Sequence, residues 1–481
     1  MGMVKEKVRS MHNSLNKLMV SKILRNSITG DIEDLQHLEK YLHRVSHIPG
    51  LSDYLKGLLR DANNKSGSAL LFERIGKQLN TSAKKQTIEN FLYSWAVKGK
   101  EKHEYYYHQE GLCVPRFVVL SPTMRCNLHC RGCYSGLYDT SGELSFDEID
   151  DVIHQAREIG SYFMVISGGE PFVRKEELLE LFEKYHDMFF MVYTNGTLID
   201  DKTIAKLAEL GNVAPAISLE GYEAETDRRR GKGVYEQATR TIRALSDAGI
   251  LTGASITYTR ENVELVSTPE YVDHLIDLGA VFAWYFMFMP VGSDPVLDLV
   301  PTPRQRRDCG NRISEIRKSR PIFLADFWND GPAAGGCLAG GKTYLHILHD
   351  GSIEPCVFAH FKVANIRKTP LKYVSSTPFF RSIREEFPYN KEGNLKRPCM
   401  IIDNPEVLRS AVQKHVANAG HDHSEDLVKD PKVIAWIDEY AKEFAALTDK
   451  QWMEEIEKPD SRWYKKGNVY KNLFSRSYRR I

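Results

Sequence analysis

The sequence predicts an α/β fold built on a parallel β-sheet and preceded by a helical region. From Cys113 to about residue 292, short apolar runs alternate with amphipathic stretches of helical period. Strands that alternate with helices in this way pair in parallel through right-handed crossovers. Residues 1–112 instead repeat apolar side chains at helical spacing, as in Ile88–Val97.

The alternating region contains six predicted strands. They are Phe117–Leu120, Phe163–Ser167, Phe189–Thr194, Ala214–Leu219, Ala254–Tyr258 and Phe282–Phe288. Five amphipathic helices are predicted between them, at Phe146–Ile159, Lys175–Lys184, Lys202–Leu210, Tyr235–Ala248 and Pro269–Leu278. The sixth strand is large and apolar, which fits either a strand buried on both faces or the wall of an apolar substrate cavity.

Composition bounds the class of protein. The chain of 481 residues is longer than a domain with a single hydrophobic core usually is, so two to four structural units are expected. A hydrophobic content of 42% is that of a soluble globular chain, and the net charge of +1 gives no field that favours nucleic acid. No apolar run reaches the roughly 18 residues of a membrane span. We expect a cytoplasmic protein, in which the eight cysteines serve metal binding or catalysis rather than disulfides.

A tight cysteine loop follows the first predicted strand. Cys126, Cys130 and Cys133 stand in a C-x3-C-x2-C arrangement. Three thiols this close converge on one centre if the loop wraps around it, and a four-iron, four-sulfide cluster normally takes four such ligands. Three ligands leave one iron open, as in a catalytic metal site. The alternatives are a zinc site completed by His129 or a distant cysteine, and three unrelated thiols.

This loop, with Tyr134 directly after it, resembles the cluster motif of the radical S-adenosylmethionine (radical SAM) enzymes. The resemblance implies a partial (β/α)6 barrel of TIM type, with the site at the C-terminal ends of the strands. It also implies that the open iron binds S-adenosylmethionine. One electron then cleaves this cofactor to a 5′-deoxyadenosyl radical, which abstracts a hydrogen atom from the substrate.

Further motifs follow the next strands and match the same family. Gly168-Gly169-Glu170 resembles the motif that holds the methionine amino group; paired glycines also permit a close approach to the backbone. Asn195 lies in a Thr-Asn-Gly stretch of the family, and Ser218 is expected near the nucleoside or the methionine. Arg230 fits the position of an arginine that reaches the cofactor carboxylate. The resemblance therefore assigns these six residues to cofactor binding.

A second cysteine group follows residue 330. Cys337 and Cys356 flank an Asp-Gly hairpin signal, which brings their thiols together, and Cys399 follows later. This stretch resembles the auxiliary-cluster domain called SPASM, or its shorter version, Twitch. With one further cysteine only, the resemblance implies one additional 4Fe-4S cluster. Its fourth ligand stays open among Cys309, a nearby His or Asp such as Asp403, and the substrate.

We therefore expect four regions: 1–112 (helical), 113–300 (radical SAM partial barrel), 301–410 (SPASM/Twitch-like α+β domain) and 411–481 (helical tail). Two basic segments with apolar side chains, Leu15–Arg25 and Trp463–Arg480, could pack on the body or contact an anionic membrane surface. Tyr105–His108 is expected to be a polar linker. The His-Asp-His sequence at 421–423 is expected in a solvated loop.

The expected function is radical modification of a peptide or protein, with an external flavodoxin- or ferredoxin-like electron donor. The alternative substrate is a lipid or another hydrocarbon at the membrane surface. A third hypothesis, an iron–sulfur electron carrier without radical chemistry, leaves the Gly168-Gly169-Glu170 motif without a purpose. The sequence assigns no catalytic side chain and no oligomeric state.

Overall fold

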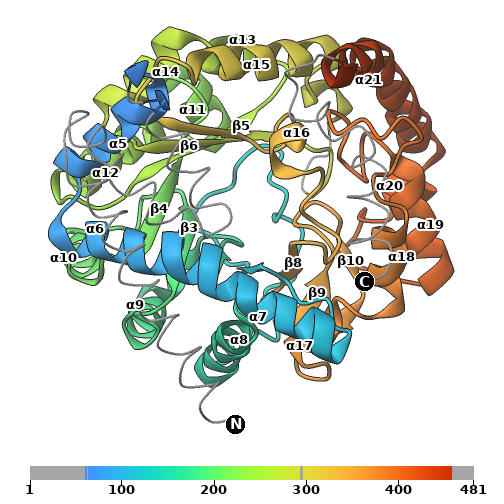
Figure 1. The fold of residues 1–481 in the computed structure, drawn as a ribbon, viewed down its shortest axis with the longest axis horizontal. Coiled ribbons are helices and arrows are strands. Elements are labelled where there is room, and N and C mark those ends of the chain that lie inside the picture. The colour runs from blue at the N-terminus through green and yellow to red at the C-terminus, as the bar shows by residue number, and fades with distance from the viewer. Residues whose placement is uncertain (1–59, 62, 293–295, 458–481) are drawn as a thin grey trace.

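The computed structural model describes residues 60–61, 63–292 and 296–457. Its centre is a ten-stranded sheet in the order β11-β9-β8-β1-β2-β3-β4-β5-β6-β7 (Figure 1). The strands of this sheet are β1 (Phe117–Leu120), β2 (Phe163–Ile166), β3 (Phe189–Thr194), β4 (Val213–Ser218), β5 (Gly253–Tyr258), β6 (Phe282–Met287), β7 (Phe323–Asp326), β8 (Tyr344–Ile347), β9 (Ser352–Glu354) and β11 (Ala364–Asn365). A separate two-stranded sheet joins β10 (Phe361–Lys362) to β12 (Asn418–Ala419).

Strands β1 to β6 form the partial barrel that the resemblance implies, and every neighbouring pair among them is parallel. Their mostly buried, apolar sequences fit a sheet that is covered on both faces. Helices surround the strands on the outside (Figure 1). In this part of the chain they are α8 (Phe146–Ile159), η3 (Pro171–Arg174), α9 (Lys175–Lys184), α10 (Asp201–Leu210), α11 (Glu223–Arg230), α12 (Val234–Asp247), α13 (Val263–Val266) and α14 (Pro269–Asp277).

Helix α8 shows how the local sequence sets these elements. Ser145 and Glu148 form a reciprocal capping box at its start, and Gly160 ends it in the left-handed conformation with a φ of 91°. Its apolar side chains Ile149, Val152 and Ile153 are buried against the sheet. The predicted bounds of this helix agree with the structure.

An N-terminal group of helices covers the end of the barrel at which the strands begin. It comprises α5 (Gly67–Gln78), α6 (Thr81–Gln86), the π-helix η1 (Thr87–Gly99), α7 (Lys100–Tyr105) and η2 (Tyr106–Glu110). On η1, the ring of Phe91 lies 5.4 Å from those of Phe163 and Phe189, the first residues of β2 and β3. The described part of the region is therefore a helical cap on the barrel. The prediction of a linker at Tyr105–His108 is wrong, because the helix continues through it.

The sheet does not stop at residue 300, where we expected the barrel domain to end. Strand β7 pairs in parallel with β6, and β8 pairs in parallel with β1, so residues of the expected auxiliary domain extend the barrel sheet on both sides. Helices of this part and of the C-terminal part pack around it. They are η4 (Leu297–Leu299), α15 (Pro303–Ile316), α16 (Gly331–Ala334), α17 (Leu371–Val374), α18 (Pro378–Glu385), α19 (Pro405–His415), α20 (Asp426–Lys429) and α21 (Pro431–Glu457).

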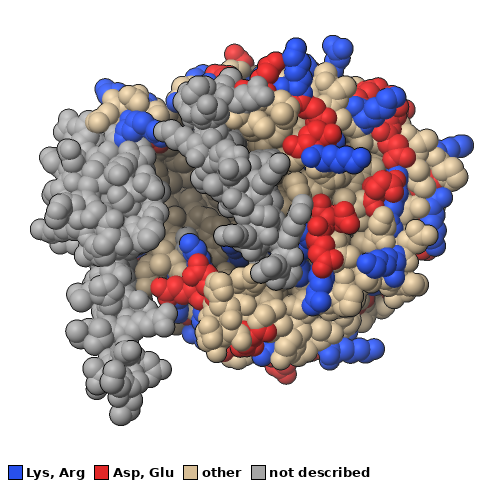
Figure 2. Space-filling model, turned by 45° about the vertical axis from the view of Figure 1, so that its right-hand side comes forward, with Lys and Arg blue, Asp and Glu red and all other residues tan. Residues whose placement is uncertain are grey.

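The surface gives little indication of a partner. Lys and Arg are interspersed with Asp and Glu over the described part of the face in Figure 2. No helix among the residues that the structure describes is long and apolar enough to cross a membrane. The two basic segments, Leu15–Arg25 and Trp463–Arg480, lie outside the described residues.

Candidate active site

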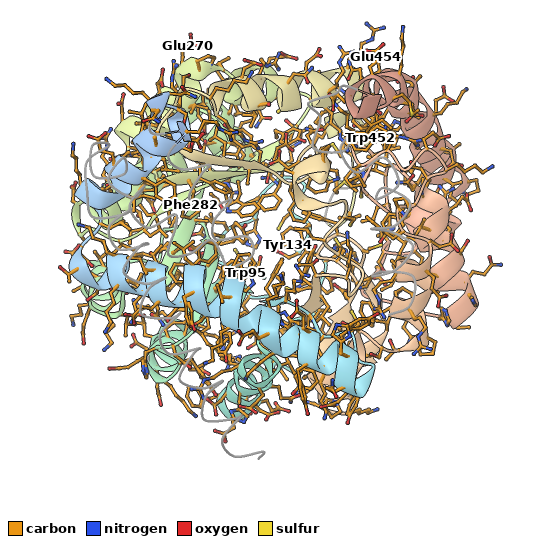
Figure 3. All side chains as sticks on the ribbon, viewed as in Figure 1. Trp95, Tyr134, Glu270, Phe282, Trp452 and Glu454 are labelled. Atoms are coloured by element: carbon orange, nitrogen blue, oxygen red, sulfur yellow. The ribbon has the colours of Figure 1, made fainter. Side chains whose placement is uncertain are left out.

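A cavity of about 1100 Å³ runs through the partial barrel. Cys126, Cys130 and Cys133 line it at the C-terminal end of β1. The six residues that the resemblance assigned to cofactor binding line the same cavity; they are Gly168, Gly169, Glu170, Asn195, Ser218 and Arg230. Figure 3 shows Tyr134, directly after the cysteine loop, close to the centre of the barrel, with Trp95 and Phe282 to its left. The fold thus brings together residues that are more than 100 positions apart.

Side chains from the neighbouring strand ends hold the cysteine loop in place. The Asn195 amide donates to the Asn127 side-chain oxygen at 2.9 Å, and the Asn127 amide donates to Thr197 Oγ1 at 2.8 Å. On the other side, the Arg131 N–H donates to the Arg229 carbonyl at 2.9 Å. Asn195 therefore acts on the loop that carries the thiols, a role that its place in the sequence did not reveal.

The paired glycines allow close packing of the protein's own chain. A Cβ atom on Gly168 would lie 2.4 Å from the Thr123 carbonyl oxygen, and one on Gly169 would lie 2.4 Å from that of Arg125. On this side, the close approach that we expected for a ligand is made by the segment that leads into Cys126. Glycine is required here because any larger residue would displace the cysteine loop.

Glu170 is buried, with 1% of its surface exposed. Its carboxylate accepts hydrogen bonds from the Phe172 N–H at 3.0 Å, Thr194 Oγ1 at 2.7 Å and the Asn195 N–H at 2.7 Å. Burial raises the pKa of Glu170, and these three donors partly oppose that shift. Glu170 thus fixes the ends of β2 and β3 relative to each other, at the wall of the cavity.

Two arginines converge on the buried carboxylate of Glu220, which follows β4. Arg229 Nη1 lies 2.9 Å from Glu220 Oε1, and Arg230 forms a bidentate ion pair with the same group. Burial opposes the ionised carboxylate, but the charges of Arg230 and Arg229 hold the pKa of Glu220 below its ordinary value. Arg230 also points Nη1 at Cys130 Sγ, 3.9 Å away. A fixed positive charge thus lies beside one thiol of the loop.

The donor set fits an iron–sulfur cluster. Three thiols at one end of a cavity supply the soft ligands that such clusters use. Desolvation raises the pKa of Cys126 to about 11, so this thiol stays protonated until a metal binds. The exposed His129 is not among the residues that line the cavity. In the described part of the chain no three His, Cys, Asp or Glu side chains stand in metal-coordinating positions, and the assignment of these ligands remains a prediction.

The second group of cysteines also gathers in space. Burial raises the pKa of Cys337, Cys356 and Cys399 to about 12 each, and each thiol acts electrostatically on another member of the group. Tyr344 Oη lies 3.3 Å from Cys356 Sγ, at the edge of the main cavity. These couplings place the three thiols in one neighbourhood, and their assignment to an auxiliary cluster stays a prediction.

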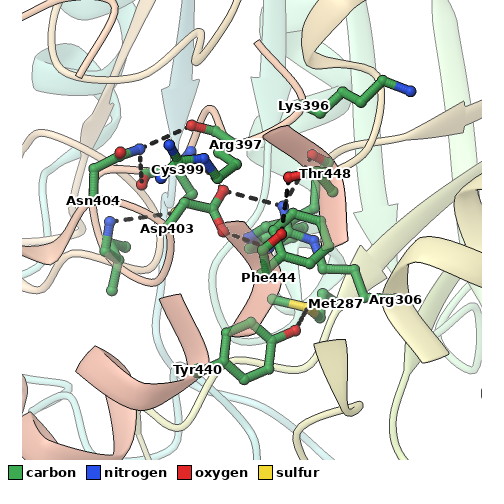
Figure 4. Close-up of polar contacts among 12 residues, drawn as sticks. Met287, Arg306, Lys396, Arg397, Cys399, Asp403, Asn404, Tyr440, Phe444 and Thr448 are labelled. Carbon is green, nitrogen blue, oxygen red and sulfur yellow. Dashed lines mark hydrogen bonds and ion pairs between the residues drawn. The ribbon is translucent and has the colours of Figure 1, made fainter. Parts of the chain in front are cut away.

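Two of the expected fourth ligands are engaged elsewhere. Both oxygens of Asp403 contact the Arg306 guanidinium, and one also accepts the Cys399 N–H at 2.9 Å (Figure 4). Cys309 is fully buried on α15, and hydrogen bonding to Ser267 partly opposes the rise in its pKa that burial causes.

The rest of the cavity wall is apolar. Side chains that alternate along the strands face inward, and the sixth strand contributes Phe282, Trp284 and Phe286. Its large side chains therefore line the cavity rather than only filling the core. The N-terminal cap adds Phe91 and Trp95. Such a wall suits an apolar group of a substrate.

Comparisons with known proteins agree with this fold and site. Residues 120–278 match the radical SAM superfamily, and residues 337–400 match SPASM, an iron–sulfur cluster-binding domain. The chain is 30% identical over 277 residues to the mycofactocin maturase MftC of Mycobacterium tuberculosis, covering 54% of this chain and 69% of that protein. It is 26% identical over 314 residues to an AdoMet-dependent heme synthase of Nitratidesulfovibrio vulgaris, covering 58% and 84%.

A solved structure shows the same fold. The crystal structure of Streptococcus suis SuiB aligns with a TM-score of 0.51 at 19% identity, over 60% of this chain and 72% of that one. The chain belongs to the radical SAM superfamily and carries a SPASM domain. It is an enzyme that uses a 4Fe-4S cluster and S-adenosylmethionine, and its SPASM domain adds auxiliary iron–sulfur chemistry.

Proposed function

We propose that this enzyme abstracts a hydrogen atom from an apolar carbon of a peptide or protein, which enters the barrel cavity. When bound, the cluster and S-adenosylmethionine supply the 5′-deoxyadenosyl radical for this reaction. One observation carries the proposal: the thiols and the cofactor-binding motifs occupy one end of a cavity whose remaining wall is apolar. The likeness to a maturase supports a peptide as the substrate.

The chain's own residues have distinct tasks in this proposal. Cys126, Cys130 and Cys133 hold the cluster that binds the cofactor, and Arg230 places a positive charge beside Cys130. Glu170 and Asn195 keep the strand ends and the cysteine loop in register for the cofactor. The aromatic wall excludes water, which protects a reactive radical from side reactions.

The second group, Cys337, Cys356 and Cys399, is proposed to hold the auxiliary cluster. With Asp403 paired to Arg306 and Cys309 placed elsewhere, these three thiols are the protein ligands that we assign to it. We further propose the division into regions 1–112, 113–300, 301–410 and 411–481, with strands of the third region extending the sheet of the second. The electron donor is proposed to be a flavodoxin or ferredoxin.

A second candidate substrate is a lipid or another hydrocarbon. The aromatic wall, with Phe282, Trp284 and Phe286, favours it, because an apolar cavity can bind a substrate that carries few polar groups. The heme synthase relative also shows that likeness to a maturase alone does not fix the substrate class.

One isotope experiment separates the two candidates. The reconstituted enzyme is incubated with S-adenosylmethionine and reductant, either with peptides deuterated at Leu, Val and Phe side chains or with perdeuterated dodecanoate. Mass spectrometry then shows whether 5′-deoxyadenosine gains deuterium. Gain from the peptides supports the first candidate. Gain from dodecanoate alone contradicts it and supports the second.

Membrane contact is tested separately by co-sedimentation with anionic vesicles. If the basic C-terminal segment binds lipid, binding will fall at high salt and in a chain that lacks residues 462–481. Equal sedimentation with and without vesicles at low salt would exclude the contact.

A further inference from the structure

The cavity has a second charged end, far from the cysteine loop. Arg116 lies directly before β1 and Lys342 two residues before β8, and both line the cavity. These strands are parallel neighbours, and the Arg116 N–H donates to the Thr343 carbonyl at 2.7 Å. Both residues therefore lie at the N-terminal ends of the strands. The cysteine loop follows the other end of β1, roughly 13 Å away for a four-residue strand.

The two cations lie close enough to repel each other. Arg116 is exposed, and its guanidinium makes no hydrogen bond or ion pair with another described residue. Lys342 is half-buried; its Nζ donates to the Gly335 carbonyl at 2.6 Å and lies 3.7 Å from the Phe387 ring. Burial lowers the pKa of Lys342 to about 8, with Cys337 opposing this shift and Arg116 adding to it. An anion between these groups would relieve the repulsion between the two positive charges.

No described carboxylate lines the cavity at this end, and Cys337, which acts on Lys342, is not among the lining residues. Among the described residues that line the cavity, Glu170 is the one acid, and it lies at the cysteine end with its oxygens hydrogen-bonded to the protein. Apolar side chains further along β1 and β2, such as Val119 and Val165, line the cavity between the two ends. A ligand that matches this arrangement has an apolar body and an anionic end.

We propose that Arg116 and Lys342 form a subsite for the carboxylate of an apolar substrate, whose reacting carbon then lies beside the cysteine loop. The inference rests on the proposed radical function, since it places the substrate in the same cavity. A planar guanidinium suits bidentate pairing with a carboxylate, and the ammonium adds a second charge. The carboxylate belongs either to a free apolar acid or to the C-terminus of an apolar peptide.

The test measures binding to the reconstituted full-length enzyme with S-adenosylmethionine present. Two matched pairs of probes are used: dodecanoate against dodecanol, and N-acetyl-Leu-Leu-Phe against its C-terminal amide. Each is titrated into wild type, Arg116→Gln, Arg116→Lys and Lys342→Met. Arg240→Gln, on an exposed arginine of α12, is the control for loss of one charge.

In wild type and in Arg240→Gln, at least one acid will bind about tenfold or more tightly than its neutral partner. Arg116→Gln will abolish this preference, Lys342→Met will reduce it, and Arg116→Lys will restore part of it. The acid that shows the effect identifies the source of the carboxylate. Equal binding of acid and neutral probe in both pairs, or a preference that survives Arg116→Gln, would overturn the proposal. Formation of 5′-deoxyadenosine is recorded in parallel; its absence with the acid preference intact would count against the radical function and not against the subsite.

Discussion

Arg306 and Asp403 form an ion pair in which both side chains are fully buried. The Arg306 guanidinium also lies 3.8 Å from the ring of Phe444 on α21, and Asp403 accepts the Cys399 N–H. Figure 4 shows these groups around one point. The pair thus joins α15, the last auxiliary cysteine and the C-terminal helix, so a change here should affect both stability and the auxiliary metal centre.

Removing one member of this pair should be costly. Asp403→Leu leaves the Arg306 charge buried without a counterion, and the free energy of unfolding should fall by about 3–5 kcal/mol. In the double variant Arg306→Met/Asp403→Leu, most of this loss should be recovered, because no charge stays buried. Urea unfolding measures both. A double variant as unstable as the single one would show that the ion pair is not the cause, and Asp438→Asn in the more exposed pair with Arg409 serves as a control.

Glu170→Gln should weaken S-adenosylmethionine binding about tenfold or more, since a hydrogen bond to a charged group contributes about 1.5–3 kcal/mol. An amide cannot accept all three hydrogen bonds from Phe172, Thr194 and Asn195, so the strand ends around the cofactor should loosen as well. Equilibrium binding to the reconstituted protein is the measurement. Iron content should be unchanged, as should binding in Glu180→Gln, which alters an exposed carboxylate on α9. Binding as tight as in wild type would show that the motif serves only as a turn.

His360 should make stability fall in mild acid. It is 1% exposed, its Nδ1 lies 2.6 Å from His421 Nε2, and burial lowers its pKa from 6.5 to about 4. Because the folded pKa lies below the unfolded one, the neutral form is favoured on folding. Stability is then full above pH 6.5 and is lost as the pH falls toward 4.

At pH 5 the loss from this group should be about 2 kcal/mol relative to pH 7.5. Unfolding midpoints at the two pH values, for wild type and His360→Gln, measure it. The variant should lose less on acidification, whereas His154→Gln, which alters an exposed histidine, should behave as wild type does. An identical pH dependence in wild type and His360→Gln would rule out this residue as the cause.

Loss of the auxiliary thiols should leave some cleavage of S-adenosylmethionine in place. Replacing Cys337, Cys356 and Cys399 together with Ala should remove about half of the iron, because each 4Fe-4S cluster would account for one half. Some cofactor cleavage should persist while product formation stops. Iron analysis and product analysis of the same sample provide the measurement. Wild-type iron equal to a single cluster would mean that this site holds zinc or no metal.

The barrel was predictable because its signals are local. Phe117–Leu120 and Phe189–Thr194 are apolar runs bounded by turn residues, and the structure has strands at the same bounds. Strand β7 (Phe323–Asp326) was missed, since it is short, ends in an acid and becomes a strand by pairing with β6. The sequence placed His421 in a solvated loop, but this histidine contacts His360 through a fold that no local pattern encodes.

The candidate site shows the same contrast between local sequence signals and contacts that only the fold creates. The resemblance to the radical SAM family pointed to the thiols and the glycine pair, because each of these motifs is a short run of consecutive residues. The convergence of Arg229 and Arg230 on Glu220 depends on how α11 packs against the end of β4, and the sequence contained no sign of it. Arg116 and Lys342 are 226 positions apart and meet through the parallel pairing of β1 with β8.

The most direct test of the account is anaerobic incubation of the reconstituted protein with S-adenosylmethionine and dithionite, followed by quantification of 5′-deoxyadenosine. Wild type should form it, whereas the variant with Cys126, Cys130 and Cys133 replaced by Ala should form none and retain about half of the iron. Cleavage at the wild-type rate in this triple variant, or none in iron-replete wild type, would contradict the assignment of these thiols to the catalytic cluster.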